Sequence, residues 1–241
     1  MRFSSPLKRG ILLKRYKRFL ADVELDHGGT VTASCPNTGS MRGLCAPGTP
    51  VWLSESDSKS RKYRHTWELV EDDAGSGAGL VGINTGHPNK VVQEGIEAKK
   101  IRPLAGYATL KREQKYGQSS RIDILLDDDA KGRAYVEVKN VHLMRKPGLA
   151  EFPDSVTTRG AKHLVELGDM VDEGHRAVMI YLVQRQDATR FSLADDIDPD
   201  YAVAFVRAME RGVEAYAYRC EMTIEGVSVA RSIPIKPPKL T

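Results

Sequence analysis

The fold of this chain is decided by residues 119–140, which read Ser-Ser-Arg-Ile-Asp-Ile-Leu-Leu-Asp-Asp-Asp-Ala-Lys-Gly-Arg-Ala-Tyr-Val-Glu-Val-Lys-Asn. Two runs rich in Ile, Val and Leu flank a charged turn that contains glycine, a pattern typical of a β-hairpin. Because side chains alternate between the faces of a strand, Glu137 and Lys139 share one face of the second strand. If the register sets Asp123 of the first strand opposite Glu137, two carboxylates and a lysine meet on one side of a hydrophobic sheet.

These three charges indicate a chemical site, because unpaired charge on a partly buried surface is costly. Mg²⁺ takes oxygen ligands, commonly one or two carboxylates together with waters and substrate phosphates. One interpretation is a metal site at Asp123 and Glu137, with Lys139 beside the water and the scissile phosphate. The alternative is a surface hairpin in which Glu137 and Lys139 form a solvated pair. The short Asp…Glu-x-Lys pattern does not decide between the two.

Length and composition set the class of protein. A chain of 241 residues, 41% of them hydrophobic, fits one large domain or two small ones. It has no apolar run long enough for a membrane span, and its N-terminal residues lack the pattern of a signal peptide. Its three cysteines lack Cys-x-x-Cys spacing, which suggests neither a disulfide framework nor a zinc site. A reducing cytoplasm is therefore the expected compartment.

The positive charge is concentrated near the N-terminus. Residues 1–70 hold 12 Lys/Arg and 6 Asp/Glu, whereas residues 71–241 hold 24 and 26. A basic N-terminal third is expected if this part contacts a polyanion, although ordinary solvated strand faces would explain a surplus of this size equally well.

The N-terminal part has the pattern of a small β-barrel or sandwich. Short alternating segments are expected as strands at residues 19–25, 30–34, 49–54 and 61–70, with turn residues between them. Basic residues interleave with Tyr16, Phe19, Tyr63 and Trp67, which suits a face that follows a nucleic-acid backbone and stacks bases. The alternative places these aromatic rings in the core. The basic residues expected to contact DNA here are Arg15, Lys17, Arg18, Arg61, Lys62 and Arg64.

A Gly-rich stretch at residues 72–79 suggests a linker or flexible loop, and we divide the chain into residues 1–80 and 81–241. A helix is expected from Pro88 to about Lys100, since proline favours the first helical position. The apolar face of this helix is formed by Val91, Val92 and Ile96. Glu94, at the edge of that face, is the acid expected to reach the site, with a plain surface carboxylate as the alternative.

A second helix, residues 159–172, can be capped by Thr157 or Thr158. Its polar side would present Arg159, Lys162 and His163 to phosphate oxygens, or simply to solvent. The apolar run 177–183 predicts a strand buried on both faces. With the elements that follow, the pattern from residue 88 onward predicts an α/β domain with helices on a mixed sheet.

Four runs, Cys-Pro-Asn-Thr-Gly-Ser-Met (35–41), Ser-Arg-Ile-Asp-Ile-Leu-Leu (120–126), Tyr-Val-Glu-Val-Lys-Asn-Val (135–141) and Phe-Pro-Asp-Ser-Val-Thr-Thr-Arg-Gly-x-Lys-His-Leu (152–164), resemble the sugar fermentation stimulation protein A (SfsA) family. The resemblance implies an N-terminal OB-like barrel and a C-terminal domain similar to PD-(D/E)xK nucleases, as in restriction endonucleases. By position, Asp123, Glu137 and Lys139 match the nuclease motif, and Glu94 matches the acid of its first helix. Ile122 stands where the motif name has proline.

The family resemblance implies DNA binding without strong sequence preference and a proposed regulatory role in maltose metabolism. Two functions follow as expectations. The first is a phosphodiesterase dependent on Mg²⁺ or Mn²⁺, with no organic cofactor; the second is a non-catalytic DNA-binding regulator that keeps the nuclease-like domain for its shape. The expected partner is double- or single-stranded DNA in the cytoplasm, at the nucleoid; no membrane partner is expected, and a homodimer is left open. In the first function Asp123, Glu137 and Glu94 hold the metal, Lys139 orients water and phosphate, and the backbone is clamped by Arg159, Lys162 and His163.

Overall fold

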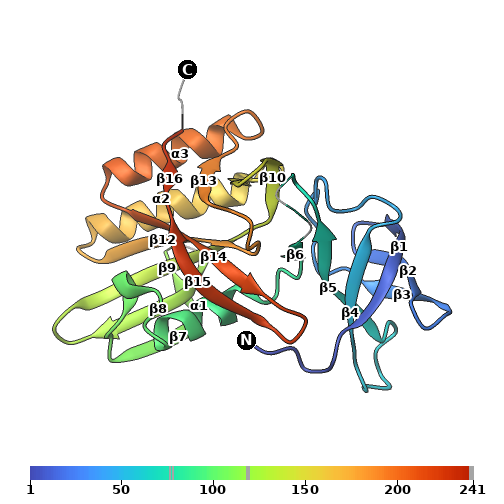
Figure 1. Ribbon diagram of the computed structural model, residues 1–241. Helices are drawn as coiled ribbons and strands as arrows, with labels where there is room; N and C mark the ends of the chain where they lie inside the picture. Colours follow the sequence, from blue (N-terminus) through green and yellow to red (C-terminus); the bar gives the residue numbers. More distant parts are fainter. Residues whose placement is uncertain (76, 78, 118–119, 239–241) are drawn as a thin grey trace.

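The computed structural model describes residues 1–75, 77, 79–117 and 120–238 (Figure 1). Ser119 of the predicted hairpin, and residues 76 and 78 of the Gly-rich stretch, lie outside the described residues. An N-terminal β-barrel lies beside a larger C-terminal unit of strands and helices (Figure 1). This arrangement confirms the predicted two-domain fold class.

Five N-terminal strands form a closed barrel in the order β3-β2-β1-β4-β5, and a parallel pairing of β3 with β5 closes the sheet. The sheet is extended beyond β5 by β6 (Gly79–Gly82). The five barrel strands are β1 (Lys8–Tyr16), β2 (Leu20–Leu25), β3 (Thr30–Ser34), β4 (Pro50–Glu55) and β5 (His65–Asp72).

The barrel interior is filled by alternating apolar side chains, among them Leu12, Val23 and Leu53. Trp67 is also fully buried there, and its Nε1 donates to the carbonyl of Leu69 at 2.8 Å. Trp67 is therefore a core residue rather than a base-stacking platform, because the hydrophobic effect favours burying its large ring. Phe19, in contrast, is 50% exposed.

The Gly-rich stretch joins two paired strands of the barrel sheet, β5 and β6. It is therefore a loop within the N-terminal sheet and does not link the two units. Because β6 spans Gly79–Gly82, a domain boundary between residues 80 and 81 would divide that strand.

The C-terminal unit is built on a six-stranded mixed sheet with the order β15-β14-β12-β9-β8-β7. Its inner strands β9, β12 and β14 are parallel, and the pairs towards both edges are antiparallel. The strands are β7 (Thr109–Tyr116), β8 (Ser120–Asp128), β9 (Gly132–Val141), β12 (Arg176–Val183), β14 (Glu214–Met222) and β15 (Val227–Ile233).

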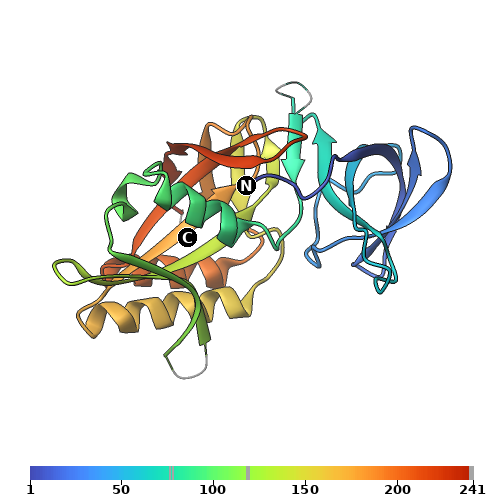
Figure 2. The same ribbon diagram turned by 90° about the horizontal axis from the view of Figure 1, so that it is seen from below.

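Helices cover both faces of this sheet (Figure 2). The first, α1 (Pro88–Glu97), packs with Val91, Val92 and Ile96 against one face, as predicted. The helices α2 (Thr158–Asp172) and α3 (Pro199–Glu210) pack together on the other face. The Thr157 side chain accepts a hydrogen bond from the Gly160 amide and so caps α2.

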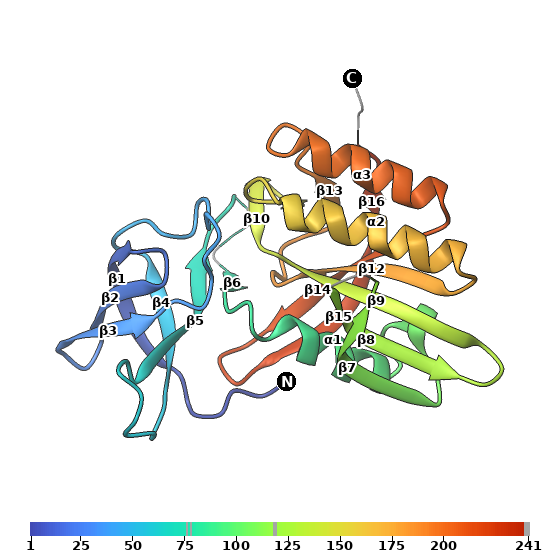
Figure 3. The same ribbon diagram turned by 180° about the vertical axis from the view of Figure 1, so that it is seen from behind.

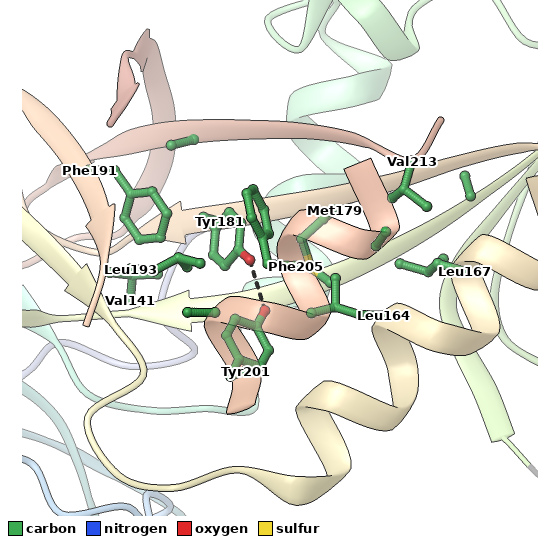
Figure 4. Close-up of a cluster of buried hydrophobic side chains, with 14 of the residues drawn as sticks. Val141, Leu164, Leu167, Met179, Tyr181, Phe191, Leu193, Tyr201, Phe205 and Val213 are labelled. Atoms are coloured by element: carbon green, nitrogen blue, oxygen red, sulfur yellow. Dashed lines mark hydrogen bonds between the residues drawn. The ribbon is translucent and has the colours of Figure 1, made fainter. Parts of the chain in front are cut away.

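The central strand β12 is buried on both faces, as its apolar sequence predicts. Met179 and Tyr181 face the α2–α3 side, whereas Val178 and Ile180 face α1. In the cluster of Figure 4 the hydroxyls of Tyr181 and Tyr201 are 2.8 Å apart, so the two buried groups satisfy each other.

A small second sheet has the order β10-β11-β13-β16. The sequence pattern did not reveal it, because strands of two to four residues are too short to show alternation. Its strands are β10 (Leu143–Lys146), β11 (Leu149–Phe152), β13 (Arg190–Leu193) and β16 (Ile235–Lys236).

The barrel and the larger unit lie side by side (Figure 3). Leu69 of β5 packs into the apolar cluster of the larger unit, and polar contacts also join the two units. The Arg185 guanidinium is 1% exposed and pairs with Asp72 of β5 and with Asp187, both at 2.8 Å. Nearby, Asp154 accepts hydrogen bonds from the Ser40 hydroxyl and the Met41 amide of the barrel. These contacts fix the barrel against the mixed sheet.

In the part of the chain that the structure describes, no helix has both the length and the apolar character needed to cross a membrane.

Candidate functional site

The predicted hairpin opens where its two acids lie. The antiparallel ladder of β8 and β9 runs from Asp128 opposite Gly132 to Ile124 opposite Val136. One position further, Oδ2 of Asp123 accepts a hydrogen bond from the Val138 amide at 2.7 Å. The side chain thus takes the place of a main-chain acceptor, and Asp123 and Glu137 lie on neighbouring strands where the ladder ends.

This end of the hairpin forms the floor of a pocket of about 640 Å³. The N-terminal ends of α1 and α2 border the same pocket, through Asn89 and Gly160. A helix N-terminus carries a partial positive charge, so both helices favour an anion in this space. Its ionisable lining residues are Glu113, Arg121, Asp123, Glu137, Lys139, Arg159, Lys162 and His163.

Glu137 is the most enclosed acid of the pocket, with 3% of its surface exposed. Its Oε1 accepts hydrogen bonds from Lys139 Nζ at 2.8 Å and from the His163 ring. Burial by itself would raise the pKa of Glu137, but the His163 hydrogen bond and the charge of Lys139 outweigh it and lower the pKa below its usual value. The second oxygen, Oε2, is buried and has no hydrogen-bond partner among the described residues.

His163 contacts Arg159, Glu137 and Lys139, whose Nζ lies 3.4 Å from Nδ1, and its tautomer follows from the contact with Arg159. Arg159 Nε can only donate, so His163 Nε2 accepts this hydrogen bond at 3.3 Å. With Nε2 as the acceptor, the ring proton lies on Nδ1, which donates to Glu137 Oε1. Arg159 therefore orients the histidine that in turn orients the acid.

Asp123 differs from Glu137 in its ionisation. Burial, and next the negative charge of Glu137, raise the pKa of Asp123 to about 6. Hydrogen bonds from the Val138 amide and from Asn89 Nδ2, the latter at 2.8 Å, oppose this rise without cancelling it. Two carboxylates this close are not both easily ionised unless a positive charge joins them.

Two further residues of the pocket were missed by sequence reasoning. Asn89 Nδ2, on the first turn of α1, donates both to Asp123 and to Glu113 Oε1, the latter at 3.1 Å. The register of β7 and β8 places Glu113 beside Asp123, because Arg112 pairs with Ile124 and Gln114 with Ile122. Glu113 also has a φ of +53°, unusual for a residue other than glycine. No spacing rule links it to the hairpin motif.

Glu94 does not reach the pocket. Its Oε2 pairs with the amino group of Met1 at 2.5 Å. Glu94 lies five residues beyond Asn89, which is about 7.5 Å further along the helix. The first-helix residue that contacts Asp123 is therefore Asn89, and the placement of Glu94 as a metal ligand does not fit this geometry.

The basic residues at the start of α2 do gather at the pocket. Arg159 and Lys162 are exposed and line it, while His163 is buried. Lys162 also pairs with the buried Glu166 at 3.5 Å. The alternative, in which this side of α2 is simply solvated, does not hold for His163, because the helix packs over β9 and buries that side chain.

The basic residues expected on the barrel differ in availability. Arg15 donates to the carbonyls of Arg18, Asn37 and Gly39, so its guanidinium holds the local loops together. Lys17 and Arg18 are exposed in the turn between β1 and β2.

The basic segment before β5 is also exposed, at Arg61, Lys62 and Arg64. Within it, Lys62 Nζ lies 5.5 Å from the centre of the Tyr63 ring, and Arg64 pairs with Glu55 at 3.3 Å.

Comparisons with known proteins identify the family to which this architecture belongs. Residues 86–226 match the sugar fermentation stimulation protein RE domain, and residues 13–83 match the SfsA N-terminal OB domain. The chain belongs to the SfsA family. Sugar fermentation stimulation protein homologs from Brucella ovis and Brucella abortus are each 58% identical over 236 residues, covering 98% of both chains. The predicted family is thereby confirmed.

A solved SfsA structure supports the fold. The structure of Pyrococcus furiosus SfsA in complex with Ca²⁺ matches with a TM-score of 0.87 and 27% identity, covering 98% of each chain. The barrel and the mixed-sheet unit of this SfsA family member therefore follow the family arrangement.

The pocket offers some of the oxygen ligands that a divalent cation needs. The unpartnered Oε2 of Glu137 and the neighbouring carboxylate of Asp123 are hard oxygen donors, the type that Mg²⁺ and Mn²⁺ accept. Among the described residues, however, no three His, Cys, Asp or Glu side chains converge closely enough to enclose a metal ion. A cation here would therefore depend on waters or substrate oxygens for its other ligands.

Proposed function

We propose that this protein binds DNA through its phosphate backbone, with little sequence preference, and hydrolyses a phosphodiester bond with a divalent cation held by Asp123 and Glu137. The observation that carries the proposal is the buried, unpartnered Oε2 of Glu137 beside Asp123. A family member has been solved in complex with Ca²⁺, which prefers the same oxygen ligands as Mg²⁺.

A cation would resolve the electrostatic conflict of the two acids, because it favours the ionised form of both. Bound there, Mg²⁺ or Mn²⁺ would supply Lewis-acid stabilisation of the charge that develops on the phosphate. Glu113 and Asn89 support this role indirectly, since Asn89 holds the Asp123 carboxylate in place.

The remaining groups suit the phosphate. Lys139 Nζ lies within the pocket and is only a hydrogen-bond donor, so it can hold a phosphate oxygen or orient the attacking water. Arg159 and Lys162 border the same space, next to the N-terminal end of α2. A guanidinium holds two phosphate oxygens at once, which suits Arg159 as a clamp on the strand.

The barrel supplies a second surface for the same strand. Lys17, Arg18 and the half-exposed ring of Phe19 form one turn, which combines charge with a stacking platform. The protein would then act where DNA is present, in the cytoplasm at the nucleoid.

A second candidate function is DNA binding without cleavage. It is favoured by Lys139, whose ammonium group already neutralises Glu137 at 2.8 Å without any metal. The absence of a third converging ligand among the described residues favours the same function.

The deciding experiment incubates the purified protein with duplex DNA, single-stranded DNA and RNA, with Mg²⁺, with Mn²⁺ and with a chelator. Cleavage is expected with metal only, and Glu137→Gln and Lys139→Ala should lower its rate about a hundredfold or more. Arg190→Gln, an exposed residue outside the pocket, is the matched control. Metal-independent cleavage, or full activity in Lys139→Ala, would refute the catalytic proposal.

Binding is measured on the same substrates across a salt series. Affinity should fall steeply with salt, since phosphate contacts release counterions. Binding without cleavage on all substrates would establish the second candidate, whereas a flat salt response would refute both.

A further inference from the structure

A second concave site lies at the other end of α1. Lys99, Lys100 and Arg102, which follow the helix, border one side of a cavity of about 600 Å³. Arg231 of β15 borders it as well, together with Tyr216 of β14. Because α1 has ten residues, its two ends are about 15 Å apart, and the cavity lies at the end away from the candidate functional site.

The cavity is strongly cationic. Of the described residues that line it, four are Lys or Arg and none is Asp or Glu. No carboxylate pairs with Arg102 or Arg231 in the described part of the chain, whereas Arg176 and Arg211 are each held by acids. Four gathered cations repel one another, and an anion between them would relieve that repulsion.

The acid that contacts Tyr216 is already paired with a cation. Glu214 lies two residues before Tyr216 on β14, and its two oxygens accept hydrogen bonds from Arg176 at 2.6 and 2.8 Å. Its charge is therefore matched by a cation outside the cavity lining.

The turn that brings two of the lysines together is strained. The Lys99 and Lys100 amides donate to the carbonyls of Ile96 and Gly95, both at 2.9 Å, which is the hydrogen-bond pattern of a Schellman helix end. Its left-handed position is commonly glycine, yet here Lys99 holds a φ of +57°. This backbone conformation places the Lys99 side chain in the lining of the cavity.

Aromatic rings complete the site. Tyr218 is buried, with 4% of its surface exposed, while Tyr216 is half-buried. The Tyr216 hydroxyl donates to Glu214 Oε2 at 2.6 Å, which restrains its ring at the cavity wall. A fixed ring next to Lys and Arg is the combination that proteins use to stack a base and hold its phosphate.

We propose that this cavity binds a phosphate-bearing nucleotide, either a free mononucleotide or one unit of a nucleic-acid strand. Arg102, Arg231 and Lys99 hold the phosphate, and the ring of Tyr216 packs against the base. Lys100, whose Nζ donates to the Val229 carbonyl at 2.9 Å, adds positive charge from the cavity wall. The site is separate from Asp123 and Glu137 and goes beyond the proposed function, since it needs neither a metal ion nor hydrolysis.

The test is isothermal titration calorimetry of the full chain at low salt with a chelator present. The probes are thymidine 5′-monophosphate, thymidine, inorganic phosphate and a short single-stranded oligothymidylate. Wild type should bind the phosphorylated nucleotide or the oligonucleotide, and the double variant Arg102→Gln/Arg231→Gln should lose about tenfold or more in affinity. Arg190→Gln/Arg207→Gln, which removes two exposed arginines outside the cavity, should bind like wild type.

Two further comparisons separate this site from general charge attraction and identify its ligand. The chelator keeps divalent cations out of the pocket at Asp123 and Glu137, so a failed metal site leaves this result standing. Tyr216→Leu should lower affinity for the nucleotide but not for inorganic phosphate, and Tyr216→Phe should retain it. The mononucleotide and oligonucleotide titrations tell which of the two sources is bound.

The proposal is overturned if wild type binds neither nucleotide probe, or if the cavity variant and the control variant bind equally. It is also overturned if inorganic phosphate binds as tightly as the nucleotide and Tyr216→Leu changes nothing. Thermal melts of all variants exclude unfolding as the cause of any loss.

Discussion

The Asp123 carboxylate accepts the hydrogen bond of the Val138 amide, at a point where a regular hairpin would use a main-chain carbonyl. The ladder of β8 and β9 ends one position earlier, so the side chain satisfies an N–H group that the parting strands leave behind. The hydrogen bond that completes the end of the hairpin therefore also holds Asp123 beside Glu137.

The raised pKa of Asp123 predicts a pH-dependent stability. Its usual value of 3.8 rises to about 6 in the folded protein, so the folded state binds this proton more tightly than the unfolded state. The resulting stabilisation is complete below the unfolded value and is lost as the pH rises through about 6. With chelator present, wild type should lose about 2 kcal/mol in free energy of unfolding as the pH rises from about 4 to 7. Asp123→Asn lacks this titrating group and should not show that loss.

Urea unfolding at several pH values measures this difference. The hydrogen bonds lost in the variant lower its free energy of unfolding by the same amount at every pH. The raised pKa is therefore tested by the slope of the free energy of unfolding against pH. Parallel pH profiles for the two proteins would contradict the raised pKa.

The contact of Glu137 with His163 should be strongly coupled. Removing the ring by His163→Ala leaves a buried carboxylate with Lys139 as its remaining partner, and we expect a loss of about 2 kcal/mol in stability. In a double-mutant cycle with Glu137→Gln, the double variant should lose less stability than the sum of the two single losses, by about 1 kcal/mol or more. Additive losses in denaturant unfolding would show that the contact contributes nothing.

The metal response should separate the acids of the pocket from Glu94. At a hundredfold excess over Kd, Mn²⁺ should stabilise wild type by about 2.7 kcal/mol. Asp123→Asn and Glu137→Gln should abolish this rise in Tm, and Glu113→Gln should weaken metal affinity about tenfold. Glu94→Gln should keep the full response, since Glu94 pairs with the amino group of Met1.

These melts are run with and without Mn²⁺ for each protein. An unresponsive wild type would argue for the solvated pair of Glu137 and Lys139. If Glu94→Gln alone lost the rise in Tm with Mn²⁺, Glu94 would be a metal ligand after all.

Arg185 should couple the two units. Its buried guanidinium contacts Asp72 of the barrel and Asp187 of the larger unit, so Arg185→Met leaves two acids without their partner. We expect a loss of about 3 kcal/mol and separate melting of the two units. Calorimetry detects the change from one transition to two; Arg190→Met, at an exposed position, is the control and should keep one transition.

Much of this fold could be predicted from local sequence. The alternating hairpin, the apolar strand β12 and the Thr157 cap each depend on neighbours a few residues apart, so periodicity and turn chemistry reveal them. The short strands of the second sheet could not be found in this way, because their pairing is set by distant partners.

The residues of the candidate site also fall into those that local sequence predicts and those that only tertiary packing reveals. The sequence by itself determined that Glu137 and Lys139 share one strand face and that Asp123 lies on the strand before it, because alternation along a strand is local. Only the tertiary structure decided that Asn89 and Glu113, rather than Glu94, complete the pocket. A periodic pattern fixes the face of an element on which a residue lies, whereas the packing of helix against sheet fixes which turn of that helix meets the hairpin.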